Sequence, residues 1–159
     1  MKTAFHTLRQ SARWLTVTLL LSVLASWSAH AELVLVVSNR SSIEHLSREQ
    51  TINIFMGRYR KAPNDTTIRP LDLEKEAPER RLFYRQLIDK SLEEVNAYWA
   101  RLMFSGRTAP PIPVKGQTEL LDILLNDPAT IGYVDRSWLN SMEGNSRAKS
   151  LRIVFALPI

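Results

Sequence analysis

The sequence contains no cysteine and only three histidines among its 159 residues. The lack of cysteine excludes disulfides, thiolate nucleophiles and cysteine-bound metals, so the burial of apolar side chains must stabilise the fold. His6 and His30 lie in the N-terminal segment described next, which leaves His45 alone in the rest of the chain. A catalytic triad or a histidine metal site would depend on that one side chain. We therefore expect no enzyme activity, no catalytic residue, no metal site and no cofactor.

The first 31 residues have the order of a secretory signal peptide. Three basic residues and no acidic one precede an apolar run at positions 14–27, and Ala29 and Ala31 then have the spacing of a cleavage site. The alternative is a membrane anchor, but the apolar run is shorter than the roughly 20 residues that span a bilayer. We predict cleavage after Ala31 and export to the periplasm, with no membrane-spanning segment in the mature protein.

An excess of charge of one sign is also missing once this segment is removed. Three of the 21 lysines and arginines lie in residues 1–31, so residues 32–159 carry 18 basic against 16 acidic side chains, a net charge of +2. This balance gives no reason to expect a nucleic acid or an anionic membrane surface as partner. The remaining 128 residues have the length of one ordinary domain.

Short apolar runs alternate with helical patterns along this domain. The strand-like runs lie at residues 32–37, 67–72, 130–134 and 151–157. Helical spacing of apolar residues lies between them, at about 48–56, 78–88, 92–103 and 117–125. Capping boxes begin two of these helices, and Pro70 places the second strand near a sheet edge. Alternating strands and helices predict an α/β fold with a mostly parallel sheet and flanking helices.

Three stretches of the domain carry motifs that recur together in one known family. They are INIFMGRYRKAPNDTTIRPLDL, RLFYRQLIDKSLEEVNAYWARLMFSG and DPATIGYVD. In this order they resemble the substrate-binding proteins of ABC phosphate transporters, in particular their short, single-lobe relatives, over nearly all of residues 33–157. The resemblance implies a type 2 periplasmic-binding-protein fold for residues 32–159. Full members have two lobes that close on the ligand from both sides, and this chain has room for about one.

The resemblance also implies where a phosphate would bind. Members of the family hold it with an arginine and with backbone N–H groups and hydroxyls at helix starts. The positive end of the helix dipole attracts the anion there. Here Glu76 and Ala77 replace the Gly-Ser pair before the helix that begins near Pro78, and Arg80 keeps the position of the arginine. The alternative, which the sequence favours, is that Arg80 lies on a solvated face and pairs with Glu76 and Glu79.

The loop after the first strand is a second candidate. Four polar residues follow that strand directly: Ser38, Asn39, Arg40 and Ser41. Ligands of open α/β sheets bind beyond the carboxyl ends of strands, and Ser105, just after the third helix, can join this lining. The sequence gives equal weight to the alternative that these serines and asparagines only form turns. Together with Arg80, these are the candidate ligand-binding residues.

Two functions remain open on this basis. The first is a periplasmic solute-binding protein for phosphate or another small oxyanion, with an inner-membrane permease as partner. The second is a periplasmic accessory or sensor-input module that binds a membrane protein and has no retained phosphate site. The single lobe and the altered helix start suit the second, while kinship supports the first.

Overall fold

A computed structural model describes residues 32–61, 65–106, 108–142 and 144–158. The predicted signal peptide, residues 1–31, lies outside the described residues, so its cleavage stays a prediction. Within the described residues, none of the helices has both the length and the apolar character needed to cross a bilayer.

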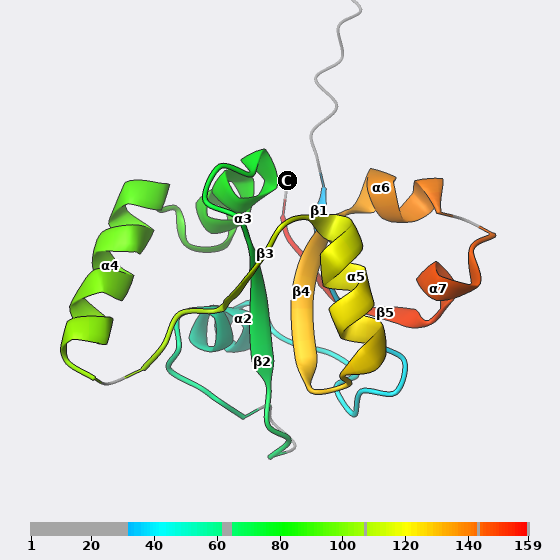
Figure 1. Cartoon of the computed structure of the whole chain (residues 1–159), viewed down its shortest axis with the longest axis horizontal. Helices are drawn as coiled ribbons and strands as arrows, with labels where there is room; N and C mark the ends of the chain where they lie inside the picture. Colours follow the sequence, from blue (N-terminus) through cyan, green and yellow to red (C-terminus); the bar gives the residue numbers. More distant parts are fainter. Residues whose placement is uncertain (1–31, 62–64, 107, 143, 159) are drawn as a thin grey trace, which may run out of the picture. The chain divides into compact units, whose positions relative to one another are not determined.

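The described part contains a sheet of five strands in the order β3-β2-β4-β1-β5. Their bounds are β1 Leu33–Ser38, β2 Arg69–Leu73, β3 Ile112–Val114, β4 Thr130–Asp135 and β5 Leu151–Ala156. β2 pairs parallel with β3 and β4, and β1 pairs antiparallel with β4 and β5. Four strands therefore run in one direction and β1 in the other, which confirms the α/β fold with a mostly parallel sheet (Figure 1).

The direction of β1 was not contained in its sequence. All six of its residues are buried, as the unbroken apolar run predicted. That pattern is typical of parallel strands, yet β1 is antiparallel to both of its neighbours. Its last residue, Ser38, therefore lies beside Leu151, the first residue of β5. We call this side, where β2, β3, β4 and β5 begin, the amino edge, and the side where they end the carboxyl edge.

Two details of the sheet differ from expectation. β2 was placed near a sheet edge because of Pro70, but it lies between β3 and β4. The proline is tolerated because β3 pairs with β2 only from Leu71 onward, so no strand lies beside Pro70 on that side. β3 itself was not predicted, because Pro110, Pro111 and Pro113 make residues 110–114 look like a loop.

The four helices predicted from apolar spacing begin close to where the sequence placed them, and of the two shorter helices that follow, the last, at residues 146–149, was not predicted. Their bounds are α2 Arg48–Phe55, α3 Pro78–Ile88, α4 Leu92–Phe104, α5 Gln117–Asn126, α6 Arg136–Ser141 and α7 Ser146–Lys149. The capping boxes of α2 and α4 form as predicted, with Ser47 and Ser91 at the N-caps. α3 begins at Pro78, where the missing N–H would have no helical partner in any case.

Neighbouring residues of β4 show that helices cover both faces of the sheet. Tyr133 stacks on Phe83 of α3, with ring centroids 3.9 Å apart, and also lies against Phe55 of α2. Gly132 points the other way, toward Leu120 of α5. Because successive residues of a strand face opposite sides, α2 and α3 pack on one face and α5 on the other. Figure 1 shows α5 in front of the strands.

α4 packs less completely than its sequence predicted. We expected Leu92, Val95, Trp99, Leu102 and Met103 to form its inner face. Only Val95 and Trp99 are buried, Met103 is 53% exposed, and the neighbouring Phe104 is 95% exposed. The helix lies to one side of the strands, at the left in Figure 1. It therefore leaves much of its apolar surface uncovered.

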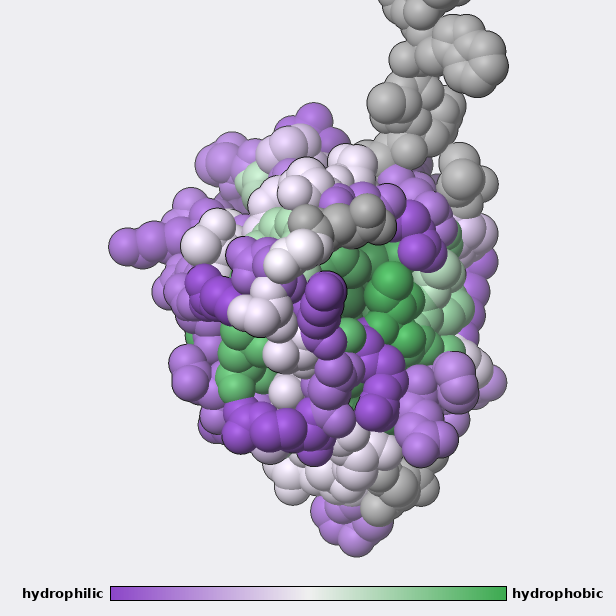
Figure 2. All heavy atoms as spheres, turned by 90° about the vertical axis from the view of Figure 1, so that its right-hand side faces the viewer, coloured by the Kyte–Doolittle hydropathy of each residue, from purple (hydrophilic) through white to green (hydrophobic). Residues whose placement is uncertain are grey.

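The opposite side of the molecule also exposes some apolar surface. Figure 2 shows an apolar area surrounded by hydrophilic residues on the side that carries β5, α6 and α7. β5 is the outer strand of the sheet there, and its Ile153 is 36% exposed.

Candidate functional site

A buried carboxylate on β2 organises the most polar part of the core. Asp72 Oδ2 accepts hydrogen bonds from Arg80 Nε at 2.8 Å and from the Tyr84 hydroxyl at 2.9 Å. Its Oδ1 accepts from the Tyr133 hydroxyl at 2.6 Å. Arg80 and Tyr84 are one turn apart on α3, and Tyr133 comes from β4, so the cluster joins three elements. Asp72 is 5% exposed and Arg80 6% exposed.

Further contacts hold the two partners of the ion pair in place. The Arg80 guanidinium carbon lies 5.3 Å from the centre of the Tyr84 ring, a cation–π distance. Arg80 Nη2 donates to Asn96 Oδ1 on α4 at 3.4 Å. Arg80 Nη1 is buried and has no hydrogen-bond partner among the described residues. The Tyr133 hydroxyl also accepts a bond from the Leu73 N–H at 3.3 Å.

Burial and the Asp72 charge control protonation in this cluster. Burial, reinforced by the negative charge of Asp72, raises the pKa of Tyr84 and that of Tyr133 well above the usual range. Both hydroxyls therefore stay protonated and donate hydrogen bonds to the carboxylate. Burial alone would lower the pKa of Arg80, but its bond and attraction to Asp72 outweigh that effect and raise it.

The expectation for Arg80 on a solvated face is wrong. Arg80 pairs with Asp72 in the core rather than with Glu76 or Glu79. The partner was missed because Asp72 lies in the preceding strand and only the tertiary fold brings it to the helix. One signal was available, since Asp72 stands between Leu71 and Leu73 in an apolar strand, where an acidic residue needs a buried partner.

The carboxyl edge is where three helices begin, after β2, β3 and β4. A carboxylate side chain lies at the start of each of these three helices. Glu79 lies in the first turn of α3, and Glu119 of α5 accepts the Lys115 N–H at 2.6 Å. Asp135 accepts the N–H groups of Ser137 and Trp138 at the start of α6. These carboxylates neutralise the positive helix ends that would otherwise attract an anion.

The start of α3 offers little else to an oxyanion. Its N-cap, Ala77, makes no side-chain hydrogen bond, and Pro78 has no N–H to donate. Glu79 accepts a bond from Gln117 Nε2 at 3.4 Å, and the side-chain oxygen of Gln117 accepts the Asp135 N–H at 3.0 Å. The polar side chains at this edge therefore already bond to backbone N–H groups or side chains of the same edge.

The loop after β1 lies at the amino edge, because β1 is reversed. The Ser38 hydroxyl accepts the Arg40 N–H at 3.3 Å, and the Ser41 hydroxyl accepts the Ile43 N–H at 3.4 Å. Asn39 Nδ2 donates to the Lys149 carbonyl at 2.7 Å. The Arg40 guanidinium donates to the carbonyl of Leu125. These contacts are those of a well-formed turn, the alternative that the sequence had left open.

The candidate residues are thus not brought together. Arg80 is a buried residue of α3, while Ser38, Asn39, Arg40 and Ser41 lie at the amino edge. Ser105 is exposed and caps the end of α4, where its hydroxyl donates to the Leu102 carbonyl at 2.9 Å. Ligand binding by any of them stays a prediction.

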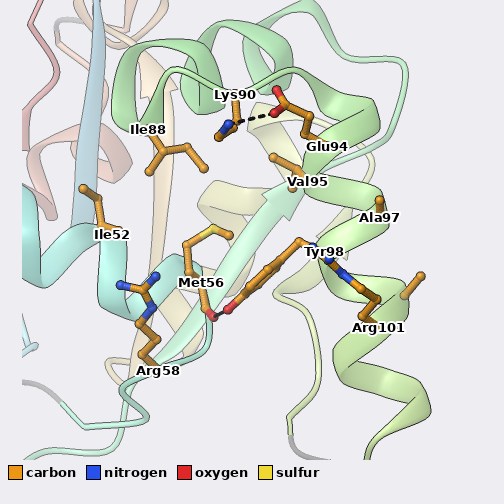
Figure 3. Close-up of a pocket in the computed structure, with 11 residues that line it drawn as sticks. Ile52, Met56, Arg58, Ile88, Lys90, Glu94, Val95, Ala97, Tyr98 and Arg101 are labelled. Atoms are coloured by element: carbon orange, nitrogen blue, oxygen red, sulfur yellow. Dashed lines mark hydrogen bonds and ion pairs between the residues drawn. The ribbon is translucent and has the colours of Figure 1, made fainter.

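A groove that the sequence did not reveal lies between α2 and α4 (Figure 3). Its cavity volume is about 680 Å³. The lining is mostly apolar, with a few charged residues: Ile52, Met56, Arg58, Ile88, Lys90, Glu94, Val95, Ala97, Tyr98, Ala100 and Arg101. The Tyr98 hydroxyl donates to the Met56 carbonyl at 2.8 Å and joins the two helices at the floor of the groove. One signal for the groove was present in the sequence. α4 carries more apolar residues than a single buried helix face needs.

Comparison with known proteins gives the fold a context. No family model and no curated protein matches the chain. An ABC-type phosphate transport receptor from Vibrio cholerae matches in structure with a TM-score of 0.56 and 16% identity, over 77% of this chain and 45% of that one. PstS from Borrelia burgdorferi matches with a TM-score of 0.57 and 19% identity, over 77% of this chain and 46% of that one.

These matches cover only part of each known protein. The chain spans about half the length of the proteins that it matches. At these identities the likeness is one of fold. The chain therefore has the fold of a partial, single-lobe relative of the substrate-binding proteins of ABC phosphate transporters.

Proposed function

We propose that this protein is an exported, single-lobe binding module, related to the substrate-binding components of phosphate transporters, that acts by binding an inner-membrane permease or sensor protein. Residues 1–31 direct it to the periplasm and are cleaved after Ala31. In this proposal it holds no free phosphate in the manner of its two-lobed relatives. It is not an enzyme.

The observation that carries the proposal is the Asp72–Arg80 ion pair. Arg80 is the residue that the family resemblance assigns to phosphate, and its Nε already donates to a buried carboxylate at 2.8 Å. A phosphate that competed for this arginine would leave Asp72 buried without its charge partner. Separating a buried pair in this way costs about 3–5 kcal/mol, which a single oxyanion contact does not offset.

The surroundings of the ion pair support the same conclusion. Ligand pockets enclose about 70–90% of a small ligand. The described residues match about half of each structural neighbour, and within them Asp72 is 5% exposed and Arg80 6% exposed. A module that binds a protein needs no ligand pocket around this pair.

One observation favours the second candidate, a binder of small oxyanions. Arg80 Nη1 is buried and lacks a hydrogen-bond partner among the described residues. An anion oxygen placed there would satisfy the donor without displacing Asp72 from Nε. The acidic side chains at the start of α3 oppose this function, since Glu79 lies in the first turn of the same helix.

Phosphate binding separates the two candidates. Residues 32–159 are dialysed against radiolabelled phosphate, and their melting temperature is measured with and without millimolar phosphate. A ligand at a hundredfold excess over its Kd would stabilise the fold by about 2.7 kcal/mol. We expect neither retention of label nor a rise in melting temperature. Saturable retention, weakened by Arg80→Lys, would establish the oxyanion binder in place of the partner module.

The partner is tested in intact cells. The full chain is expressed with photo-crosslinking residues at exposed positions on both sides of the domain, and the products are identified by mass spectrometry. We expect one inner-membrane protein to be recovered. Efficient export without a crosslink to any envelope protein would contradict the proposed function.

A further inference from the structure

The groove between α2 and α4 has the features of a protein-binding surface. Met56 and Tyr98 meet at its floor, with Ile88 of α3 on one side and Val95 of α4 on the other in Figure 3. Methionine and tyrosine both suit a surface that adapts to a partner, because one is flexible and the other combines an apolar ring with a polar tip. Ala97 is exposed on α4 and leaves the space that forms the opening.

The apolar surface continues past the groove along α4. Ala97, Ala100 and Phe104 are separated by three and four residues, so they lie on the same side of the helix. Phe104, at the end of this row, is 95% exposed. From Glu94 to Phe104 the surface is about 15 Å long at the rise of an α-helix. It is therefore long enough for two or three turns of a second helix.

The charges around the groove are mainly positive. Lys90 pairs with Glu94 at 2.7 Å, which leaves two arginines at the rim. Arg58 is exposed and donates to the neutral Asn53 side chain at 3.3 Å. Arg101 is exposed, and no described acidic side chain pairs with it. A partner with acidic residues on either side of an apolar stripe would complement this rim.

We propose that this groove receives an amphipathic helix of the partner protein, with its apolar stripe against the partly exposed Ile52, Ile88 and Tyr98 and its acidic residues toward Arg58 and Arg101. Such helix-in-groove recognition uses anchors spaced by three and four residues. This inference rests on the proposed function and names the surface through which it acts.

A second copy of the chain fits the groove less well. It would have to present an exposed apolar helix face with acidic flanks. α5 carries Glu119 and Asp122, but three of its five apolar residues are buried: Leu120, Leu121 and Leu124. A small amphiphile would cover the groove but leave the row that ends at Phe104 uncovered.

The test uses two synthetic helical peptides of about 16 residues, a length that allows partial helix formation. Both carry leucines at three- and four-residue spacing, with glutamates on the flanks in one and lysines in the other. Binding to residues 32–159 is measured by fluorescence anisotropy. We expect the glutamate peptide to bind at least tenfold more tightly than its lysine twin.

Three variants locate the binding. Ala97→Trp fills the opening and is expected to weaken binding of the glutamate peptide at least tenfold. Arg101→Glu is expected to reverse the preference between the two peptides. Lys75→Glu makes the same charge change on an exposed residue at the carboxyl edge and is expected to leave binding unchanged. All three positions are exposed, and circular dichroism checks that each variant folds.

Several outcomes would overturn the inference. Binding of neither peptide would do so, as would binding that Ala97→Trp leaves unaffected. Saturable binding of dodecanoate that excludes the peptide would indicate a small amphiphile instead. A concentration-dependent dimer in sedimentation that Ala97→Trp abolishes would indicate a second copy of the chain. Crosslinking in cells separates this failure from failure of the proposed function. A crosslink to a membrane protein from position 75 but not from 97 keeps the function and rejects the groove, and crosslinks from no position reject both.

Discussion

At the scale of single residues, one carboxylate determines the character of the site. Asp72 accepts three hydrogen bonds from side chains, two of them from tyrosine hydroxyls that burial keeps protonated. The guanidinium that phosphate would need is committed to the same carboxylate. A satisfied buried network is stable, whereas removal of any one donor leaves the buried carboxylate with a hydrogen bond unmade. The carboxylate at position 72 therefore determines the protonation and hydrogen bonding of this region more than Glu76 and Ala77 at the start of α3 do.

This network predicts a loss of stability in alkaline solution. The pKa values of Tyr84 and Tyr133 are raised in the folded state, so the unfolded chain loses these protons first as the pH rises. Their stabilising effect is complete below the unfolded pKa of about 10 and is lost as the pH rises toward the folded values. The free energy of unfolding should fall by about 1.4 kcal/mol per pH unit for each tyrosine.

Urea titrations between neutral and alkaline pH measure this slope, and tyrosinate absorbance follows the two hydroxyls. Tyr133→Phe should remove about half of the tyrosine contribution. It should also cost about 1.5–3 kcal/mol at neutral pH, because it removes a hydrogen bond to a charged group. As the control, Tyr98→Phe removes a bond to a backbone carbonyl and should leave the alkaline slope unchanged. An equal slope in the wild type and in Tyr133→Phe would speak against the mechanism.

At the scale of elements, the contact between β4 and α5 sets the packing on one face of the sheet. Gly132 is at the centre of this contact. A Cβ atom at that position would lie 2.6 Å from Leu120 Cδ1 and 2.9 Å from its Cγ. Leu120 is fully buried and cannot move aside without disturbing its neighbours. The glycine is therefore needed for the close approach of helix and strand.

The close approach predicts that Gly132→Ala destabilises the protein by about 1–3 kcal/mol, the usual cost of overpacking a core. The matched control is Gly116→Ala, since a Cβ there would meet nothing within 4 Å and the backbone is extended. We expect the control to change the unfolding free energy by no more than about 0.5 kcal/mol. Equal effects of the two substitutions in urea unfolding would show that the contact with α5 is not the cause.

At the scale of the whole molecule, the described residues form one domain around a single five-stranded sheet. Helices cover both faces of the sheet, and one connected core includes residues of β1, β2, β4, α2 and α3. Helices of the same domain therefore cover the core on both sides of the sheet. Among the described residues, apolar surface stays exposed on α4 and also at Ile153 of β5, and the part on α4 belongs to the proposed partner surface.

A self-contained core predicts that residues 32–159 fold alone. Produced without residues 1–31, the domain should unfold in one cooperative transition in which circular dichroism and tryptophan fluorescence coincide. Phe104→Ser, at a residue that is 95% exposed, should leave the midpoint unchanged. Two separate transitions, or folding only in the presence of a partner, would contradict this prediction.

Much of the fold could be predicted from local patterns. Ser47 and Ser91 mark the starts of α2 and α4, because a capping box is made by residues three apart and needs no tertiary contact. The strands of the centre were found because burial imposes an apolar run. β3 was missed, since its prolines argue against a strand and only pairing with β2 makes it one.

The sequence by itself determined the four longer helices and four of the five strands, that the core is held by apolar burial, and that Glu76 and Ala77 precede α3. Only the tertiary structure decided that β1 runs against the other strands, which moves Ser38 to the edge opposite the start of α3. It also decided that Arg80 pairs with Asp72. The reason is physical: capping and periodicity act over a few residues, whereas strand direction and buried ion pairs depend on which distant segments the packed core brings together.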